Sequence, residues 1–249
     1  MTADDDAPRA LVIEHTEGET VALLGDWLTE AGLRLDVVRP YAGEPLPAGL
    51  DRHGALIVMG GPQSAYDDVS GEPSAPWLPA TRALLREAAG TDTPTLGICL
   101  GAQLLADALG GIVAPGEQGP EFGAALVAKR DVAALDVLWG PVPFLPDVVQ
   151  WHFDEITDLP AGAVLLASST RYPNQAFRVG DHAYGLQFHI ETTPDMVRRW
   201  AENDAEALAA HEVDVEALLA GVAERQDDLA EVWRPFATRF AGLVSTTVG

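Results

Sequence analysis

The chain has few cysteines, few basic residues and no long apolar run. Cys99 is the single cysteine among 249 residues, so no internal disulfide can form, and a free thiol suits a reducing compartment. No apolar stretch approaches the roughly 18 residues of a membrane span. The start, Met1 to Asp6, has neither the basic nor the apolar region of a signal peptide. These absences predict a cytoplasmic protein without a membrane partner.

Positive charge is scarce as well. Lys and Arg number 15 against 38 Asp and Glu, which gives a formal net charge of −23. Such a charge repels phosphate groups and therefore excludes nucleic acid and anionic membranes as partners. Since the sequence contains no C-x-x-C, H-E-x-x-H or P-loop pattern, it predicts no metal ion, nucleotide or other cofactor.

The chain does contain the alternating strand and helix patterns of an α/β protein. With 47% hydrophobic residues it can bury a full core. Strand-length apolar runs alternate with helical patterns along the first half, and shorter strands and two helical stretches follow. We expect strands at 10–14, 33–38, 55–59, 95–98, 124–129, 148–151, 164–168, 175–179 and 183–188, and helices at 20–31, 79–89, 100–109, 194–210 and 214–240.

Three segments divide the expected organisation. Residues 1–9 form an acidic tip that we expect to be disordered, because charge runs usually are. Residues 10–194 form the α/β domain, and residues 195–249 form a helical extension packed on the same domain. We find no internal repeat.

The only cysteine stands in a G-x-C-x-G motif from Gly97 to Gly101, between a short apolar strand and a helical pattern. A nucleophile on such a sharp turn needs glycine on both sides, because a Cβ would crowd it. The turn would expose the sulfur at the carboxyl edge of the sheet. The helix N-terminus would lower the thiol pKa from about 8.5. Alone, a cysteine such as Cys99 is more often a small buried hydrophobe than a catalyst.

Two other segments favour the catalytic interpretation. Gly60-Gly61-Pro62 follows an apolar strand and could simply end it. Alternatively, the Gly61 amide is placed to join the Leu100 amide as an oxyanion donor. Near the end of another strand, His189 is followed two residues later by Glu191, and residues two apart on an extended chain share a face. His189 alone would be an ordinary surface histidine, but a thiol, a base and an orienting carboxylate together predict nucleophilic catalysis.

Together these motifs resemble the class I, triad-type glutamine amidotransferases. The resemblance rests on Gly97 to Gln103, Gly60 to Pro62 and Phe188 to Glu191, and covers roughly residues 10–200. It is strongest toward the glutaminase domains of GMP synthase and their free-standing relatives. It implies a flavodoxin-like glutaminase fold, with an open, twisted, mostly parallel central sheet flanked by helices and a helical C-terminal appendage.

The resemblance also implies further site residues. Gln103 would contact the bound glutamine, although the pattern also allows a solvent-facing helix position. Gly60, His152 and Phe153 would border the substrate. In similar proteins a glycine often stands at the position of Phe153, so the pocket of this chain is expected to differ in shape there.

Three functions remain open. The chain could release ammonia from glutamine for a separate synthetase subunit, because the roughly 50 residues after the triad are too few for a synthetase domain. It could instead hydrolyse γ-glutamyl peptides or amides on its own. A non-catalytic regulatory protein on the same fold is disfavoured, since all three triad positions are filled. The expected partner in either enzyme is a small molecule.

Overall fold

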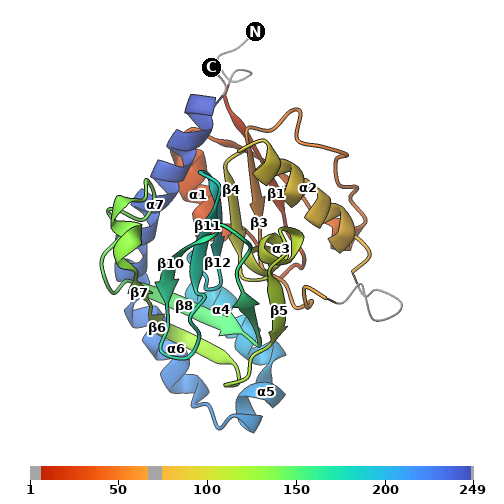
Figure 1. Cartoon of the computed structure of the whole chain (residues 1–249). Helices are drawn as coiled ribbons and strands as arrows, with labels where there is room; N and C mark the ends of the chain where they lie inside the picture. Colours follow the sequence, from red (N-terminus) through yellow and green to blue (C-terminus); the bar gives the residue numbers. More distant parts are fainter. Residues whose placement is uncertain (1–6, 67–74, 248–249) are drawn as a thin grey trace.

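The computed structural model describes residues 7–66 and 75–247. Within these residues one mixed sheet of eight strands has helices on both faces (Figure 1). In spatial order its strands are β2 (Arg34–Val38), β1 (Arg9–Ile13), β3 (Ala55–Val58), β4 (Thr95–Ile98), β12 (Ala183–Leu186), β11 (Ala176–Val179), β10 (Val164–Ser168) and β7 (Ala128–Lys129). From β2 to β12 neighbouring strands run parallel, and the remaining pairings are antiparallel. The predicted α/β architecture is confirmed.

Alternate residues of the central strands enter two separate cores. Ala10 and Val12 belong to one cluster, whereas Leu11 and Ile13 belong to the other, as the two-residue period of a strand requires. The first cluster lies under α1 and α7, and the second under α2 and α3 (Figure 1). The helices are α1 (Ala22–Glu30), α2 (Leu78–Gly90), α3 (Leu100–Ala108), α4 (Pro194–Asn203), α5 (Ala205–Ala210), α6 (Val215–Glu224) and α7 (Gln226–Thr247), with short 3-10 turns at Pro40–Ala42 and Asp131–Leu135.

Two antiparallel ribbons stand outside the main sheet. One pairs β5 (Ile112–Pro115) with β9 (Asp154–Asp158), and the other pairs β6 (Glu121–Leu126) with β8 (Asp147–His152). The sequence does not predict β5 or β9, because β5 has only four residues, all exposed or half-buried, and β9 is mostly polar. It also merges β6 and β7 into one strand at 124–129. The structure separates them at Val127 and places them in different sheets.

The C-terminal helices share the core of the sheet. Trp233, Phe236 and Phe240 of α7 are fully buried in the cluster that also holds Phe188, which follows β12. The helix expected at 194–210 divides at Asp204, and the one expected at 214–240 divides at Arg225. Asp204 ends α4 with its carboxylate accepting a hydrogen bond from Trp151 Nε1 at 2.8 Å. Such long-range contacts leave no trace in local helical periodicity.

The N-terminal boundary differs from the expectation. Arg9 already pairs with Arg34 in the sheet, and the Pro8 carbonyl accepts a hydrogen bond from the Arg34 amide at 2.9 Å. Order therefore begins before residue 10, while residues 1–6 lie outside the described part of the chain. Among the described helices, none combines the length and apolar character that a membrane crossing requires.

Candidate active site

Cys99 occupies a strained turn between β4 and α3. Its backbone angles are φ 50° and ψ −108°, a region that non-glycine residues rarely adopt. A Cβ on Gly97 would come within 2.5 Å of the Gly101 carbonyl oxygen, and a Cβ on Gly101 would overlap the Val58 carbonyl. Both atoms belong to the backbone and cannot rotate away. The turn therefore requires glycine at both positions, as the motif predicts.

The Cys99 thiol is less exposed and less acidic than the sequence predicts. The residue is only 6% exposed. Its sulfur donates to the Trp151 carbonyl at 3.7 Å and accepts from Gln187 Nε2 at 3.8 Å. Burial raises the pKa of the Cys99 thiol, although the nearby charge of His189 acts in the opposite direction. The predicted lowering by the helix terminus is wrong, because a buried thiolate loses its hydration.

His189 and Glu191 form a buried pair just beyond β12. His189 Nδ1 lies 2.7 Å from Glu191 Oε1, and the other carboxylate oxygen of Glu191 accepts from the Ile190 amide at 2.9 Å. Because the carboxylate accepts, Nδ1 carries the hydrogen and Nε2 is left as the free nitrogen. Nε2 is buried and has no hydrogen-bond partner among the described residues. The predicted contact is present, although the strand ends earlier, at Leu186.

The charge of this pair is coupled to Cys99. Burial by itself would lower the pKa of His189, but the charges of Glu191 and Cys99 raise it well above 6.5. Cys99 and His189 are thus close enough for each to shift the pKa of the other. The ring of Trp200 packs on the imidazole with centroids 4.7 Å apart. This arrangement favours a proton on His189 once the thiol has lost it.

The Gly60-Gly61 turn at the end of β3 lies against the start of α3. A Cβ on Gly61 would stand 3.0 Å from Leu100 Cδ2 and 2.7 Å from the Cβ of His15, so the two predicted oxyanion donors are neighbours. Within the described residues neither the Gly61 nor the Leu100 amide donates a backbone hydrogen bond. Neither N–H group therefore has a backbone acceptor among these contacts.

Buried His15 packs against this turn. Its Nδ1 accepts from Trp77 Nε1 at 2.8 Å, and its carbonyl accepts from Gln63 Nε2 at 3.3 Å. Burial lowers the pKa of His15 to about 4, so the ring is neutral at pH 7. A neutral ring fits this apolar location, where a charged one would be unpaired.

A cavity of about 270 Å³ opens beside Cys99. Of the predicted site residues, Cys99, Gly61, Gln103, His152 and Phe153 line it. Gln103 is 3% exposed and its Nε2 donates to Gln187 Oε1 at 3.2 Å, so the solvent-facing alternative is wrong. Phe153 is 43% exposed at the rim. The other predicted residues, Gly60, Leu100, His189 and Glu191, lie around the cavity without being part of its lining.

A model of the family described as "Glutamine amidotransferase class-I" matches residues 19–204. That range contains the cysteine turn, the double-glycine turn and the histidine–glutamate pair. This chain belongs to the class I glutamine amidotransferase family.

Curated relatives of this class I amidotransferase differ in how much of them it spans. The glutamine amidotransferase-like protein YfeJ of Salmonella typhimurium is 29% identical over 81% of this chain and 83% of its own length. Gamma-glutamyl peptidase 4 of Arabidopsis thaliana is 29% identical over 71% of this chain and 68% of its own length. The GMP synthase of Thermomicrobium roseum is 40% identical, but over 55% of this chain and 23% of its own length. The amidotransferase chain therefore spans about a quarter of that synthase.

Solved structures match nearly the whole amidotransferase chain. A glutamine amidotransferase from Thermotoga maritima superposes with a TM-score of 0.82 and 31% identity, covering 94% of this chain and 98% of that one. A glutamine amidotransferase from Methylobacillus flagellatus superposes with a TM-score of 0.80 and 29% identity. The match covers 96% of this chain and 94% of that one. The likeness thus includes the C-terminal helices as well as the sheet.

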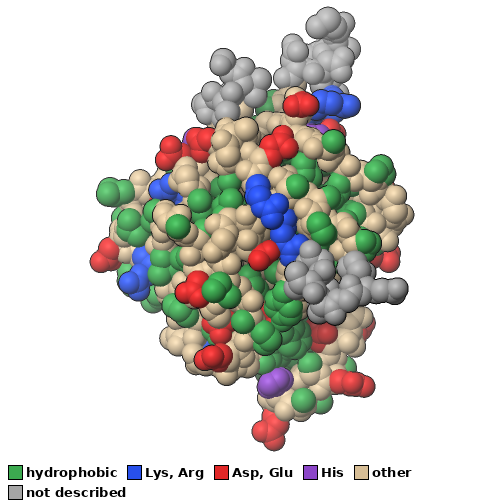
Figure 2. Space-filling model, turned by 45° about the vertical axis from the view of Figure 1, so that its right-hand side comes forward, with side chains coloured by type: hydrophobic (Ala, Val, Ile, Leu, Met, Phe, Trp, Pro, Cys, Tyr) green, Lys and Arg blue, Asp and Glu red, His purple; other side chains and the backbone are tan. Residues whose placement is uncertain are grey.

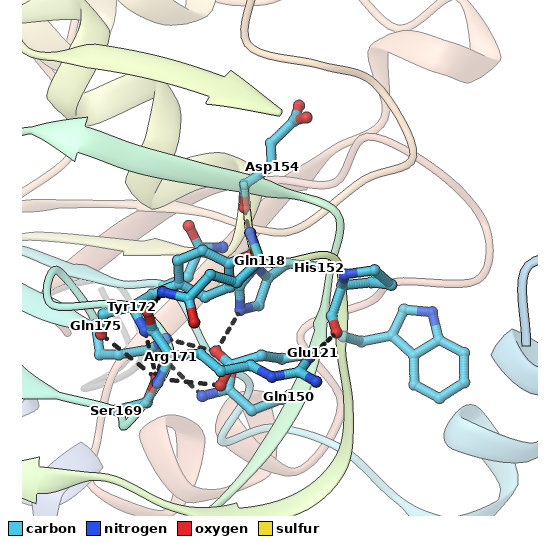
Figure 3. A network of polar contacts seen from close by, with 12 residues as sticks. Gln118, Glu121, Gln150, His152, Asp154, Ser169, Arg171, Tyr172 and Gln175 are labelled. Carbon is cyan, nitrogen blue, oxygen red and sulfur yellow. Dashed lines mark hydrogen bonds and ion pairs between the residues drawn. The ribbon is translucent and has the colours of Figure 1, made fainter. Parts of the chain in front are cut away.

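A saturated polar network holds the β8–β9 turn of the amidotransferase beside the cavity (Figure 3). Glu121 accepts from His152 Nε2 at 3.0 Å, from Gln175 Nε2 at 2.8 Å and from Ser169 Oγ at 3.1 Å. His152 Nδ1 lies 2.8 Å from the Asp154 carbonyl oxygen. Both ring nitrogens of His152 thus contact oxygen atoms of the protein, and these contacts hold the backbone that borders the cavity.

Sequence reasoning misses two acidic residues of the cavity wall. Glu19 follows β1 and Asp204 ends α4, and both line the cavity with Cys99. For Glu19 a signal exists, because β1 is a parallel neighbour of β3 and residues after their carboxyl ends meet at one edge. For Asp204 no such signal exists, since it arrives from a C-terminal helix.

Proposed function

We propose that this protein hydrolyses the γ-carboxamide of glutamine or of another γ-glutamyl compound through a thioester on Cys99. The observation that carries the proposal is the meeting of a strained cysteine turn with an unpartnered imidazole nitrogen. Cys99 stands at φ 50°, and His189 Nε2 is buried without a hydrogen bond while Glu191 holds Nδ1. A nucleophile, a base and an orienting carboxylate in this order are the parts of a catalytic triad.

The reaction begins with proton transfer. His189 Nε2 takes the proton of the Cys99 thiol as the sulfur attacks the γ-carbonyl carbon, and the oxygen gains negative charge. The amides of Gly61 and Leu100 hold that oxyanion. When the intermediate collapses, the C–N bond breaks and His189 gives its proton to the departing nitrogen. Water, deprotonated by His189, then attacks the thioester, which releases a γ-carboxylate and restores the thiol.

The remaining cavity residues position the substrate. Gln103 is held by Gln187 and offers its amide to the glutamyl half. His152 fixes the turn beside it through Glu121. Phe153 packs edge-on against Phe122 with ring centroids 5.4 Å apart, so its ring forms a fixed rim. We infer a cavity mouth narrower than a glycine at this position would leave.

The released amine has two possible fates. In the first, glutamine is the substrate and a separate synthetase subunit consumes the ammonia. The identity to a GMP synthase supports this possibility, although the chain spans only 23% of that protein. A glutaminase of this kind should hydrolyse glutamine slowly until its synthetase docks.

In the second, the protein hydrolyses γ-glutamyl peptides or amides without a partner. The specific support is coverage: the chain matches 68% of a γ-glutamyl peptidase and 98% of a solved amidotransferase chain. Such an enzyme should be active as purified.

Steady-state kinetics of the purified chain tests both. Release of glutamate from glutamine and from a panel of γ-glutamyl peptides and amides is measured with and without cell extract. Rapid hydrolysis of a γ-glutamyl amide that extract does not alter supports the second fate. Slow glutamine hydrolysis that rises with a co-purifying synthetase supports the first. Absence of any γ-glutamyl hydrolysis under both conditions refutes the proposal.

A further inference from the structure

Glu19 brings a carboxylate into the cavity beside the imidazole. It lies between β1 and α1 and lines the cavity with Cys99. Its Oε2 is so close to Gly60 that a Cβ there would overlap it, and the same Cβ would stand 3.1 Å from His189 Cε1. Glu19 therefore lies at the carbon edge of the imidazole, next to the double-glycine turn.

Of the ionisable groups acting on this carboxylate, His189 is the one of opposite charge. Among the described residues, no Lys or Arg lines the cavity, and the ionisable groups acting on Glu19 are His189, Glu191, Asp204 and the Cys99 thiol. Asp204 is bonded to Trp151, whereas Glu19 has no comparable partner among the residues described. Burial, with help from Glu191 and Asp204, raises the pKa of Glu19 to about 7 despite the opposing charge of His189. A positively charged ligand group would restore its ionised form.

Contacts around the cavity show which half of a substrate Glu19 meets. Gln103, Gln187 and the Asp154 carbonyl bond to one another on one wall. Glu19 interacts instead with His189 and Asp204. In the proposed reaction His189 protonates the departing nitrogen, so the amine half of the substrate must lie on the side of His189. Glu19 therefore faces the leaving amine rather than the glutamyl half.

We propose that the substrates are γ-glutamyl amides whose amine half carries a second, positively charged amino group, and that Glu19 selects this group. The proposal rests on the thioester chemistry proposed above and favours the partner-free fate. Hydrolysis consumes water, breaks the γ C–N bond and releases glutamate and a diamine, with His189 supplying the proton to the departing nitrogen. An amine half ending in a carboxylate meets Glu19 and Asp204 and is repelled.

The charge of the whole molecule acts in the same direction. The chain carries a net charge of −23, and acidic side chains are spread over the face seen in Figure 2, with fewer basic ones. A negative surface draws cations toward a cavity and repels anions. This general field cannot choose between cations, which is why the local carboxylate is needed for selection.

Three matched substrates test the proposal. The γ-glutamyl amides of diaminobutane, pentylamine and aminopentanoate place an ammonium, a methyl and a carboxylate group at the same distance from the amide. For the wild-type enzyme we expect kcat/KM to be about 10- to 100-fold higher for the ammonium than for the methyl compound. We expect the carboxylate compound to be poorest. Equal values for the ammonium and methyl compounds would overturn the proposal.

Variants assign the preference to one side chain. Glu19→Gln keeps the side-chain volume. It should reduce kcat/KM for the ammonium compound to the value for the methyl compound, while kcat/KM for the methyl compound changes less than about threefold. Glu17→Gln is the matched control, because Glu17 is exposed two residues away and is not part of the cavity wall. An unchanged preference in Glu19→Gln refutes the role of Glu19.

Calorimetry separates this proposal from the chemistry on which it rests. The Cys99→Ala protein should bind the ammonium compound more tightly than the methyl compound even without turnover. Because the carboxyl of Glu19 has a pKa of about 7, binding of a cation should release protons near pH 7. The measured enthalpy should then depend on the buffer. Tight, selective binding without hydrolysis in the wild type would refute the proposed function alone. Hydrolysis of all three compounds with equal binding would refute the role of Glu19 alone.

Discussion

Two neighbouring polar regions differ in how many of their polar atoms have hydrogen-bond partners. Both carboxylate oxygens of Glu121 accept hydrogen bonds, from His152, Gln175 and Ser169. Around Cys99, by contrast, His189 Nε2 has no hydrogen-bond partner among the described residues, and no described Lys or Arg lines the cavity that holds Glu19. The two regions adjoin each other, since His152 contacts Glu121 and also lines the cavity.

The difference separates residues that hold the structure from residues that act on a ligand. A buried polar group without a partner is costly, so proteins retain few of them. Where such groups converge on a cavity, a ligand can supply the missing partners. Saturated groups such as Glu121 instead fix backbone geometry. Substitutions in the two regions should therefore have opposite effects on stability and activity.

The largest expected effect follows loss of the thiol. Cys99→Ser should reduce turnover of any γ-glutamyl amide by at least about 1000-fold, because the hydroxyl is a far weaker nucleophile at this turn. Thermal stability should change little, since serine keeps the same side-chain shape with one polar atom beyond Cβ. Covalent labelling of Cys99 by an α-amino chloroketone analogue of glutamine, read by mass spectrometry, provides the second measurement. Full activity of the serine variant would remove the thiol from the mechanism.

Within the histidine–glutamate pair the two residues should differ. His189→Ala removes the base and should reduce kcat/KM more than Glu191→Gln, which keeps a hydrogen-bond partner on Nδ1. Because the Glu191 charge raises the pKa of His189, Glu191→Gln should lower that pKa and move the acid limb of the pH–rate profile to lower pH. A profile left in place, or a greater loss in Glu191→Gln than in His189→Ala, would contradict the assignment.

Breaking the saturated network should destabilise the protein. Glu121→Ala removes the acceptor that His152, Gln175 and Ser169 share, which should cost about 2–4 kcal/mol of unfolding free energy. We expect KM to rise more than kcat falls, because the β8–β9 turn moves while Cys99 stays. Urea unfolding and steady-state kinetics measure the two effects. Glu121→Gln, which retains one acceptor oxygen, should lose less.

Removing the carboxylate of Glu19 should stabilise the protein, whereas removing that of Glu121 should destabilise it. The folded-state pKa of Glu19 is about 7, above the unfolded value of 4.5, so the folded protein holds this proton more tightly. Stability is therefore lost as pH rises from 4.5 through 7. Glu19→Gln should raise Tm by about 3–8 °C at pH 8.5 and hardly change it at pH 4. A lower Tm at pH 8.5 would show that the ionised carboxylate is stabilised by the fold.

The smallest effect concerns Gly242, a glycine with no role in either region, and Gly101 of the Cys99 turn provides the contrast. Gly101→Ala should prevent the turn at Cys99 from forming, because its Cβ overlaps the Val58 carbonyl. Gly242→Ala is the control, since Gly242 is exposed on α7 with open space around it. It should stabilise the helix by about 0.5–1 kcal/mol. Thermal unfolding of Gly242→Ala and soluble yield of Gly101→Ala distinguish the two.

The sequence by itself determined the elements whose cause is local. Cys99 between two glycines, His189 two residues before Glu191, and the apolar runs of the parallel strands can all be identified without coordinates, because turn chemistry and strand period act over a few residues. Gln103 one turn into α3 belongs with them. The same reasoning failed for the acidity of the thiol, since burial depends on distant chain segments.

Tertiary structure decided everything that depends on which segments meet. Glu19 comes from the end of β1 and Asp204 from the end of α4, yet they share one cavity wall with Cys99. The ribbons β5–β9 and β6–β8 likewise exist only because their partners arrive from far along the chain. Electrostatics in a buried cavity is the sum over all neighbours at low dielectric. No local pattern carries that sum, so the acidic wall and the raised thiol pKa became visible only in the folded protein.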